Sequence, residues 1–143
     1  MLENGEGDII ACNYTVTRER NKMIDYSIPF MRTPQVLIQR KPEGWDKMTP
    51  AQLEKLMLRD PSKLAHREVH VWKNSSYFQR LLNLQDEIGD TIFIKEEDGL
   101  LGTEEMIEMV SEGLIDYTVT EENIARVNQR FFDNIDCKTA LSV

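Results

Sequence analysis

Short apolar runs alternate with longer segments of helical periodicity, and this alternation constrains the fold more than any other feature of the sequence. Runs of this length, rich in β-branched residues, are typical of strands buried on both faces of a sheet. Helices between strands favour parallel pairing through crossover connections, so the sequence predicts an α/β fold with a parallel-rich sheet and flanking helices. The predicted strands are Ile9–Cys12, Val36–Gln39, Val69–Trp72, Thr91–Ile94, Ile115–Val119 and Thr139–Val143.

Residues that favour helix ends mark the predicted helices. Thr49-Pro50, Ser75-Ser76 and Thr103 each precede apolar residues at helical spacing, and Ser and Thr are favoured N-caps. Gly113 follows the last apolar position of the third helix, where glycine commonly ends a helix in a left-handed conformation.

Composition excludes several classes of protein. A formal charge of −8, with no run of Lys or Arg, would repel nucleic acid, which is therefore not an expected partner. No segment reaches the roughly 18 consecutive apolar residues of a membrane span. Cys12 and Cys137 show no metal-binding spacing, and two buried free thiols are favoured over a disulfide.

The sequence predicts no catalytic, cofactor or metal site. His66 and His70 lie across a predicted loop-to-strand junction and cannot share a helix face as a metal pair would. The acidic pairs within Glu96–Asp98 and at Glu104-Glu105 are expected in solvated turns, where nothing would raise a carboxyl pKa for acid catalysis. No phosphate-binding glycine loop or nucleophile elbow is present.

Five motifs follow one another along the chain: Gly7–Ala11, Thr15–Arg20, Ile24–Phe30, Val69–Ser76 and Glu104–Glu121. Together they resemble the motifs of the type II, family 3 periplasmic solute-binding proteins. Tyr26, Asn74 and Glu121 replace the commoner Phe, Gly and Asp. Gly113–Val119 followed by Gln129-Arg130 is also similar to the solute-binding modules of lytic murein transglycosylases.

This resemblance implies two lobes with a ligand bound between them. Residues 1–35 would form the C-terminal part of lobe 1 and a crossing strand, residues 36–128 a complete lobe 2, and residues 129–143 a return segment to a partial lobe 1. Family motifs carried onto this sequence place the ligand-binding residues at Asn13, Thr15, Arg20, Ser75, Ser76 and Glu121.

The resemblance implies that Arg20 binds a ligand carboxylate, with Ser75 and Ser76 closing on it from lobe 2 and Glu121 facing an ammonium group. Each residue also has a purely structural interpretation. Arg20 can pair with Asp25 on the surface, the serines can serve only as N-caps, and Glu121 can simply favour the start of a helix.

Asn13 and Thr15 would line the pocket, or serve packing near the crossing strand. Tyr14 and Trp72 can stack on a ligand, although aromatic residues beside buried strands usually belong to the core.

Three hypotheses follow for the function. In the first, the chain is a periplasmic sensor module that binds an amino acid, a peptide or a muropeptide and passes lobe closure to a murein-cleaving domain of its parent protein. The parent protein would then supply any anchor to the outer membrane. In the second, the chain is a free-standing amino-acid receptor of an ABC transporter. In the third, it is a scaffold that has lost ligand binding.

Overall fold

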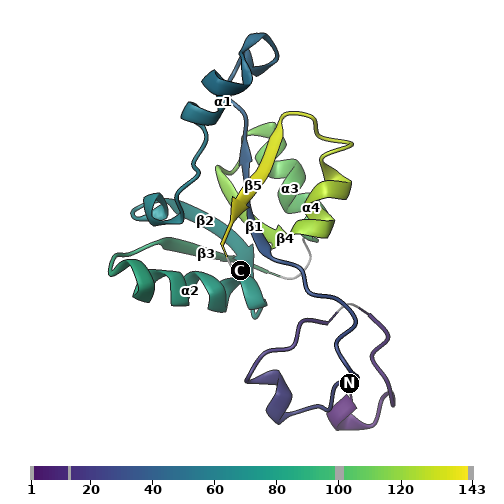
Figure 1. Ribbon diagram of the computed structural model, residues 1–143. Coiled ribbons are helices and arrows are strands. Elements are labelled where there is room, and N and C mark those ends of the chain that lie inside the picture. The colour runs from purple at the N-terminus through teal and green to yellow at the C-terminus, as the bar shows by residue number, and fades with distance from the viewer. Residues whose placement is uncertain (1, 13, 99–101, 142–143) are drawn as a thin grey trace. The chain divides into compact units, whose positions relative to one another are not determined.

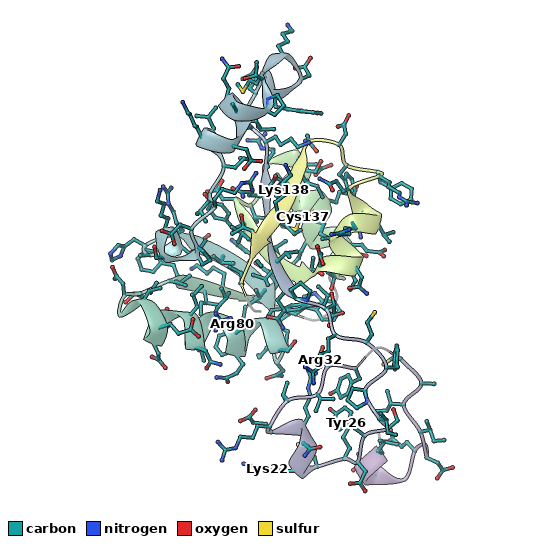
Figure 2. All side chains as sticks on the ribbon, viewed as in Figure 1. Lys22, Tyr26, Arg32, Arg80, Cys137 and Lys138 are labelled. Atoms are coloured by element: carbon teal, nitrogen blue, oxygen red, sulfur yellow. The ribbon has the colours of Figure 1, made fainter. Side chains whose placement is uncertain are left out.

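The computed structural model describes residues 2–12, 14–98 and 102–141. Its contacts divide the chain into two compact units, Met1–Arg32 and Thr33–Val143. Within the described part of the first unit, the only regular elements are two short 3-10 helices, Leu2–Asn4 and Arg20–Lys22. The second unit holds a five-stranded sheet with helices on both faces, drawn from blue to yellow in Figure 1.

The sheet of the second unit has the strand order β3-β2-β4-β1-β5. Its strands are β1 (Gln35–Arg40), β2 (Glu68–Trp72), β3 (Phe93–Glu97), β4 (Tyr117–Glu121) and β5 (Ile135–Ala140). Its α-helices are α1 (Pro50–Leu56), α2 (Ser76–Ile88), α3 (Thr103–Glu112) and α4 (Glu122–Asn128). Two 3-10 helices, Trp45–Lys47 and Pro61–Leu64, flank α1. The predicted α/β class with flanking helices is confirmed.

The sheet contains both parallel and antiparallel strand pairs. Strand β2 pairs in parallel with β3 and β4, whereas β1 is antiparallel to both β4 and β5. The strands β2, β3, β4 and β5, joined by α2, α3 and α4, therefore all run in one direction. Only β1 runs against them, because the long connection of residues 41–67 lets the chain reverse before β2. The sheet is thus mixed, which helical spacing alone does not predict.

Several predicted strand boundaries were wrong. Ile9–Cys12 forms no strand, and Ile9 is 83% exposed, because the described part of its unit offers no second strand to pair with. The fourth strand begins at Phe93 and the fifth at Tyr117, each two residues later than predicted. The last strand begins at Ile135, four residues earlier than predicted, and residues 142–143 lie outside the described residues.

Two hydrophobic clusters hold helices to opposite faces of the sheet. Alternate residues of β1 divide between them, since Leu37 packs with α2 whereas Val36 and Ile38 pack with α3 and α4. Leu81 of α2 and Met106 of α3 are fully buried at the two interfaces. This arrangement leaves the edges where the strands end available for a binding site.

The predicted helix ends at Thr49, Ser75 and Gly113 are confirmed, whereas Thr103 is the first residue of α3 and Gly102 is its N-cap. Ser75 is the N-cap of α2, with its hydroxyl accepting a hydrogen bond from the Phe78 amide at 3.3 Å. Thr49 caps α1 through a reciprocal pair of hydrogen bonds with Gln52. Gly113 ends α3 with a φ of +79°, a conformation that glycine adopts without strain.

A buried ion pair ties the connection between β1 and β2 to strand β5. Asp136 is 2% exposed, and its carboxylate accepts hydrogen bonds from both terminal nitrogens of Arg59, one of them at 3.0 Å. Gln39 donates to the same carboxylate at 3.3 Å. Outside the core, Arg59 also binds Glu54, which Lys138 reaches at 3.0 Å. The network fixes α1 and its flanking loops against the sheet.

The exposed carboxyl group of Glu54 in this network is expected to make the stability of the chain depend on pH. Hydrogen bonds from Arg59 and Lys138 hold the pKa of Glu54 at about 2, below its usual 4.5. The charged carboxylate is favoured in the folded chain, so its stabilising contribution is present above pH 4.5 and is lost as the pH falls toward 2. We expect the melting temperature of Glu54→Gln to change less with pH, between those two values, than that of the unmodified chain. An unchanged slope would show that Glu54 contributes nothing.

The two cysteines differ in environment. Both are free, and Cys137 is buried whereas Cys12 is exposed, so the prediction of two buried thiols was wrong for Cys12. Burial raises the pKa of the Cys137 thiol, which is therefore protonated at neutral pH. Among the described residues, no helix combines the length and the apolar character needed to cross a membrane.

Candidate ligand-binding site

One edge of the sheet gathers the predicted site residues of the second unit. Strands β2 and β4 end at this edge, and antiparallel β1 begins there. Only three residues separate the end of β2 from the start of α2, which places the N-terminus of the helix at the same edge. The first amides of a helix have no carbonyl partner within the helix and lie at the positive end of its dipole, so this position attracts anions.

The two serines at the start of α2 have different roles. Ser75 caps the helix through its hydroxyl, so its predicted capping role is confirmed. Ser76 is the first residue of the helix, and its hydroxyl accepts a hydrogen bond from Gln35 Nε2 at 3.3 Å. Ser76 is thus held at the edge by a residue of β1 and is not the cap.

Glu121 lies at the end of β4, directly opposite Gln35 in the β1–β4 register. Its side chain is 9% exposed and does not cap α4, where the first-turn acid is instead Glu122, paired with Arg126. Glu121 follows Val119 by two residues and therefore shares the face of the sheet covered by α2. The second unit thus brings Ser76, Gln35 and Glu121 to one edge and one face.

Gln35 was missed by sequence reasoning. It contacts Ser76 and lies opposite Glu121, yet these partners are 41 and 86 residues away in the chain. Only the strand register reveals it, and no local motif carries that information.

Helix α4 begins beside this edge but does not offer a second anion site. It has seven residues, and its first amide, that of Glu122, donates to the carbonyl of Pro34 at 2.9 Å. The hydroxyl of Thr33, the residue before Pro34, donates to Asn123 Oδ1 at 3.5 Å. These contacts fasten the start of β1 to α4, and the N-terminus of α2 remains the anion-attracting end.

The first unit positions Arg20 and Thr15 together. The Arg20 guanidinium lies 4.2 Å from the centre of the Tyr14 ring, and its Nη1 donates to the Thr15 carbonyl at 3.1 Å. Tyr14 in turn stacks on Tyr26, whose hydroxyl donates to the same carbonyl at 3.5 Å. Thr15 therefore contacts Arg20 through its backbone carbonyl. The Tyr14 ring lies against the Arg20 guanidinium, and Tyr26 stacks on Tyr14. The predicted ligand-binding residue Asn13 lies outside the described residues.

Trp72 packs into the core. It lies against the cluster beneath α3 and α4, on the other face of the sheet from Ser76 and Glu121. Its indole Nε1 and the hydroxyl of Thr120 are buried and find no hydrogen-bond partner among the described residues. The structure therefore favours the core interpretation of Trp72 over stacking on a ligand.

The buried hydroxyl of Thr120 leads to a stability prediction. Thr120 is fully buried, and its hydroxyl gains no hydrogen bond in exchange for lost water. A valine has nearly the same shape and no polar atom to desolvate. We expect Thr120→Val to raise the free energy of unfolding by about 1 kcal/mol, measured by chemical denaturation. A loss of stability would show that the hydroxyl has a partner.

Within the described residues, no group of three His, Cys, Asp or Glu side chains is placed to hold a metal ion. His66 lies in a turn and His70 in β2, as predicted. The His70 ring lies between Glu97, at 2.6 Å, and Glu68, at 3.0 Å. Glu97 belongs to β3, and Glu104 and Glu105 to the first turn of α3, so the expectation that these acids lie in turns was wrong.

Comparison with curated proteins finds membrane-bound lytic murein transglycosylases F. The chain is 34% identical over 134 residues to the protein of Desulfosudis oleivorans, covering 94% of this chain and 26% of that protein. It is 30% identical over 123 residues to the protein of Saccharophagus degradans, covering 86% of this chain and 22% of that protein. The chain thus spans about a quarter of the length of these relatives. No protein-family model matches the chain.

Solved structures show the same fold. A crystal structure of Tv2483 bound to L-arginine superposes with a TM-score of 0.75 at 18% identity, covering 99% of this chain and 51% of that one. An ancestral arginine-binding protein bound to arginine gives 0.69 at 20% identity, covering 97% and 55%. This chain resembles a solute-binding module and not a catalytic domain. It has the fold of the type II periplasmic solute-binding proteins, and its sequence is similar to part of membrane-bound lytic murein transglycosylase F.

Proposed function

We propose that the chain supplies most of a two-lobed module that binds an amino-acid-like ligand or a peptide fragment of peptidoglycan. The observation that carries this proposal is the meeting of Ser76, Gln35 and Glu121 at the edge where α2 begins. There the positive end of a helix lies on the same face of the sheet as a carboxylate. Such an edge suits a ligand that carries both a carboxylate and an ammonium group.

Each ligand group has a proposed partner. The ligand carboxylate would accept hydrogen bonds from the first amides of α2 and from the Arg20 guanidinium, whose parallel donors match two carboxylate oxygens. The ligand ammonium would donate to Glu121. Residues 1–35 would belong to lobe 1 and residues 36–128 to lobe 2, with residues 129–143 returning to lobe 1.

The relatives support a role in the cell wall. The curated relatives are named as membrane-bound enzymes that act on murein, and the chain covers only about a quarter of their length. We propose that the module senses a periplasmic murein fragment and that lobe closure regulates a murein-cleaving domain of the parent protein. A ligand drives such closure only through its higher affinity for the closed state. Any attachment to the outer membrane would come from the parent protein.

A thermal-shift screen tests this proposal. The chain and its parent protein would be screened against amino acids, short peptides and muropeptides, since a ligand that binds only the folded state raises the melting temperature. We expect a ligand-dependent rise that Glu121→Gln reduces and that Glu122→Gln, at the neighbouring acid paired with Arg126, leaves intact. No rise in either protein, with any ligand, would refute the binding function and favour a scaffold role.

A further inference from the structure

A cleft opens at the edge of the sheet opposite the candidate ligand-binding site. Its volume is about 400 Å³, and it lies where β1 ends and β4 begins, beneath the connection that carries α1. The candidate ligand site uses the other ends of these two strands. The charged residues that line the cleft are Arg40, Lys41, Lys55, Lys63, Arg67 and Asp116.

The cleft is basic although the chain is acidic. Five cationic side chains and one carboxylate give its lining a formal charge of +4, in a chain whose net charge is −8. Elsewhere in the second unit, most basic side chains pair with carboxylates, among them Arg59, Arg80 and Arg126. Among the described residues, the cleft's Arg40, Lys55, Lys63 and Arg67 form no ion pair within 4.0 Å.

Two of the cationic groups are held in place by other contacts. Arg40 lies against Gly113, where a β-carbon would come within 2.8 Å of the Arg40 Cζ. The absent side chain therefore leaves room for the guanidinium on the backbone of the α3–β4 turn. Lys41 Nζ donates to the Asp133 carbonyl at 2.6 Å and lies 3.9 Å from the centre of the Trp45 ring. Two of the cleft's five positive charges are thus held in place by neighbouring groups.

We infer that this cleft binds a small multivalent oxyanion, a ligand that carries at least two phosphate or carboxylate groups. Guanidinium groups bind such oxygens in parallel pairs, and lysines add unpaired positive charge. In the described part of the chain, the cleft has four cations without an ion pair and a single acid, so it favours a polyanion over the carboxylate–ammonium ligand proposed for the other edge. Because the two sites lie at opposite edges of the sheet, this inference stands independently of the proposed function.

Calorimetric titration of the whole chain with pyrophosphate and with citrate, at constant ionic strength, tests the inference. We expect both probes to bind, and Lys63→Gln combined with Arg67→Gln to weaken binding by about tenfold or more. Lys73→Gln combined with Lys95→Gln removes the same charge from exposed residues outside the cleft and should leave the affinity within about twofold. Absence of binding, or equal losses in both double variants, would overturn the inference.

A vesicle arm distinguishes the source of the anion. Vesicles of phosphatidylglycerol and of phosphatidylcholine would be compared in a sedimentation assay with the same two double variants. Binding to the anionic vesicles that the Lys63–Arg67 variant alone loses would identify a lipid headgroup. Binding of pyrophosphate or citrate without vesicle binding would identify a soluble oxyanion.

Discussion

Replacing Asp136 with asparagine is expected to lower the free energy of unfolding by about 3 kcal/mol. The Asp136 carboxylate is almost fully buried and accepts hydrogen bonds from Arg59 and Gln39. Asparagine keeps the shape but leaves the guanidinium of Arg59, which is 26% exposed, facing a neutral amide. The low end of the range for a broken buried pair applies, because Arg59 retains some water and also binds Glu54. Urea denaturation would measure the change.

The exposed acid of the same network provides the control. Glu54 binds the same guanidinium from the surface, where water screens the pair, so Glu54→Gln at pH 7 should lower the free energy of unfolding much less than Asp136→Asn does. The contrast between the two variants separates burial from charge. Equal losses of stability, or an Asp136→Asn variant as stable as the unmodified chain, would contradict the role given to this ion pair.

Arg20→Lys is expected to weaken ligand binding by about tenfold to a hundredfold, if the proposed function holds. Lysine retains the positive charge and its place over the Tyr14 ring, but it cannot donate two parallel hydrogen bonds to a carboxylate. Calorimetry with the ligand that gives the largest thermal shift would measure the loss.

Arg18→Lys is the matched control for Arg20→Lys. Arg18 is exposed and lies two residues from Arg20 in the same unit. Its replacement should leave the affinity within about twofold. An Arg20→Lys variant that binds as tightly as the unmodified chain would contradict the proposed carboxylate contact.

Local signals in the sequence predicted the helix starts and the fold class. Ser75 and Gly113 act on residues within one helical turn, so their effect can be recognised without knowing the tertiary structure. The alternating apolar runs likewise reflect burial on the two faces of a sheet. These features led correctly to an α/β fold and to the start of α2.

Long-range pairing could not be predicted from the sequence. The antiparallel direction of β1 depends on how the connection of residues 41–67 packs, and the contact between Arg59 and Asp136 joins residues 77 apart. Ile9–Cys12 has the composition of a strand, yet a strand forms only where a partner supplies its hydrogen bonds. The same limit hid Gln35, whose place in the site depends on register.

The measurement that tests the central claim most directly is an NMR titration of the 16.7 kDa chain with backbone assignments. The ligand would again be the one with the largest thermal shift. We expect the amide shift changes to concentrate at Ser75–Phe78 and Glu121–Asn123, together with a change in the Arg20 side-chain resonance. Changes confined to the basic cleft around Arg67, or no changes at saturating ligand, would contradict the assignment of the binding edge.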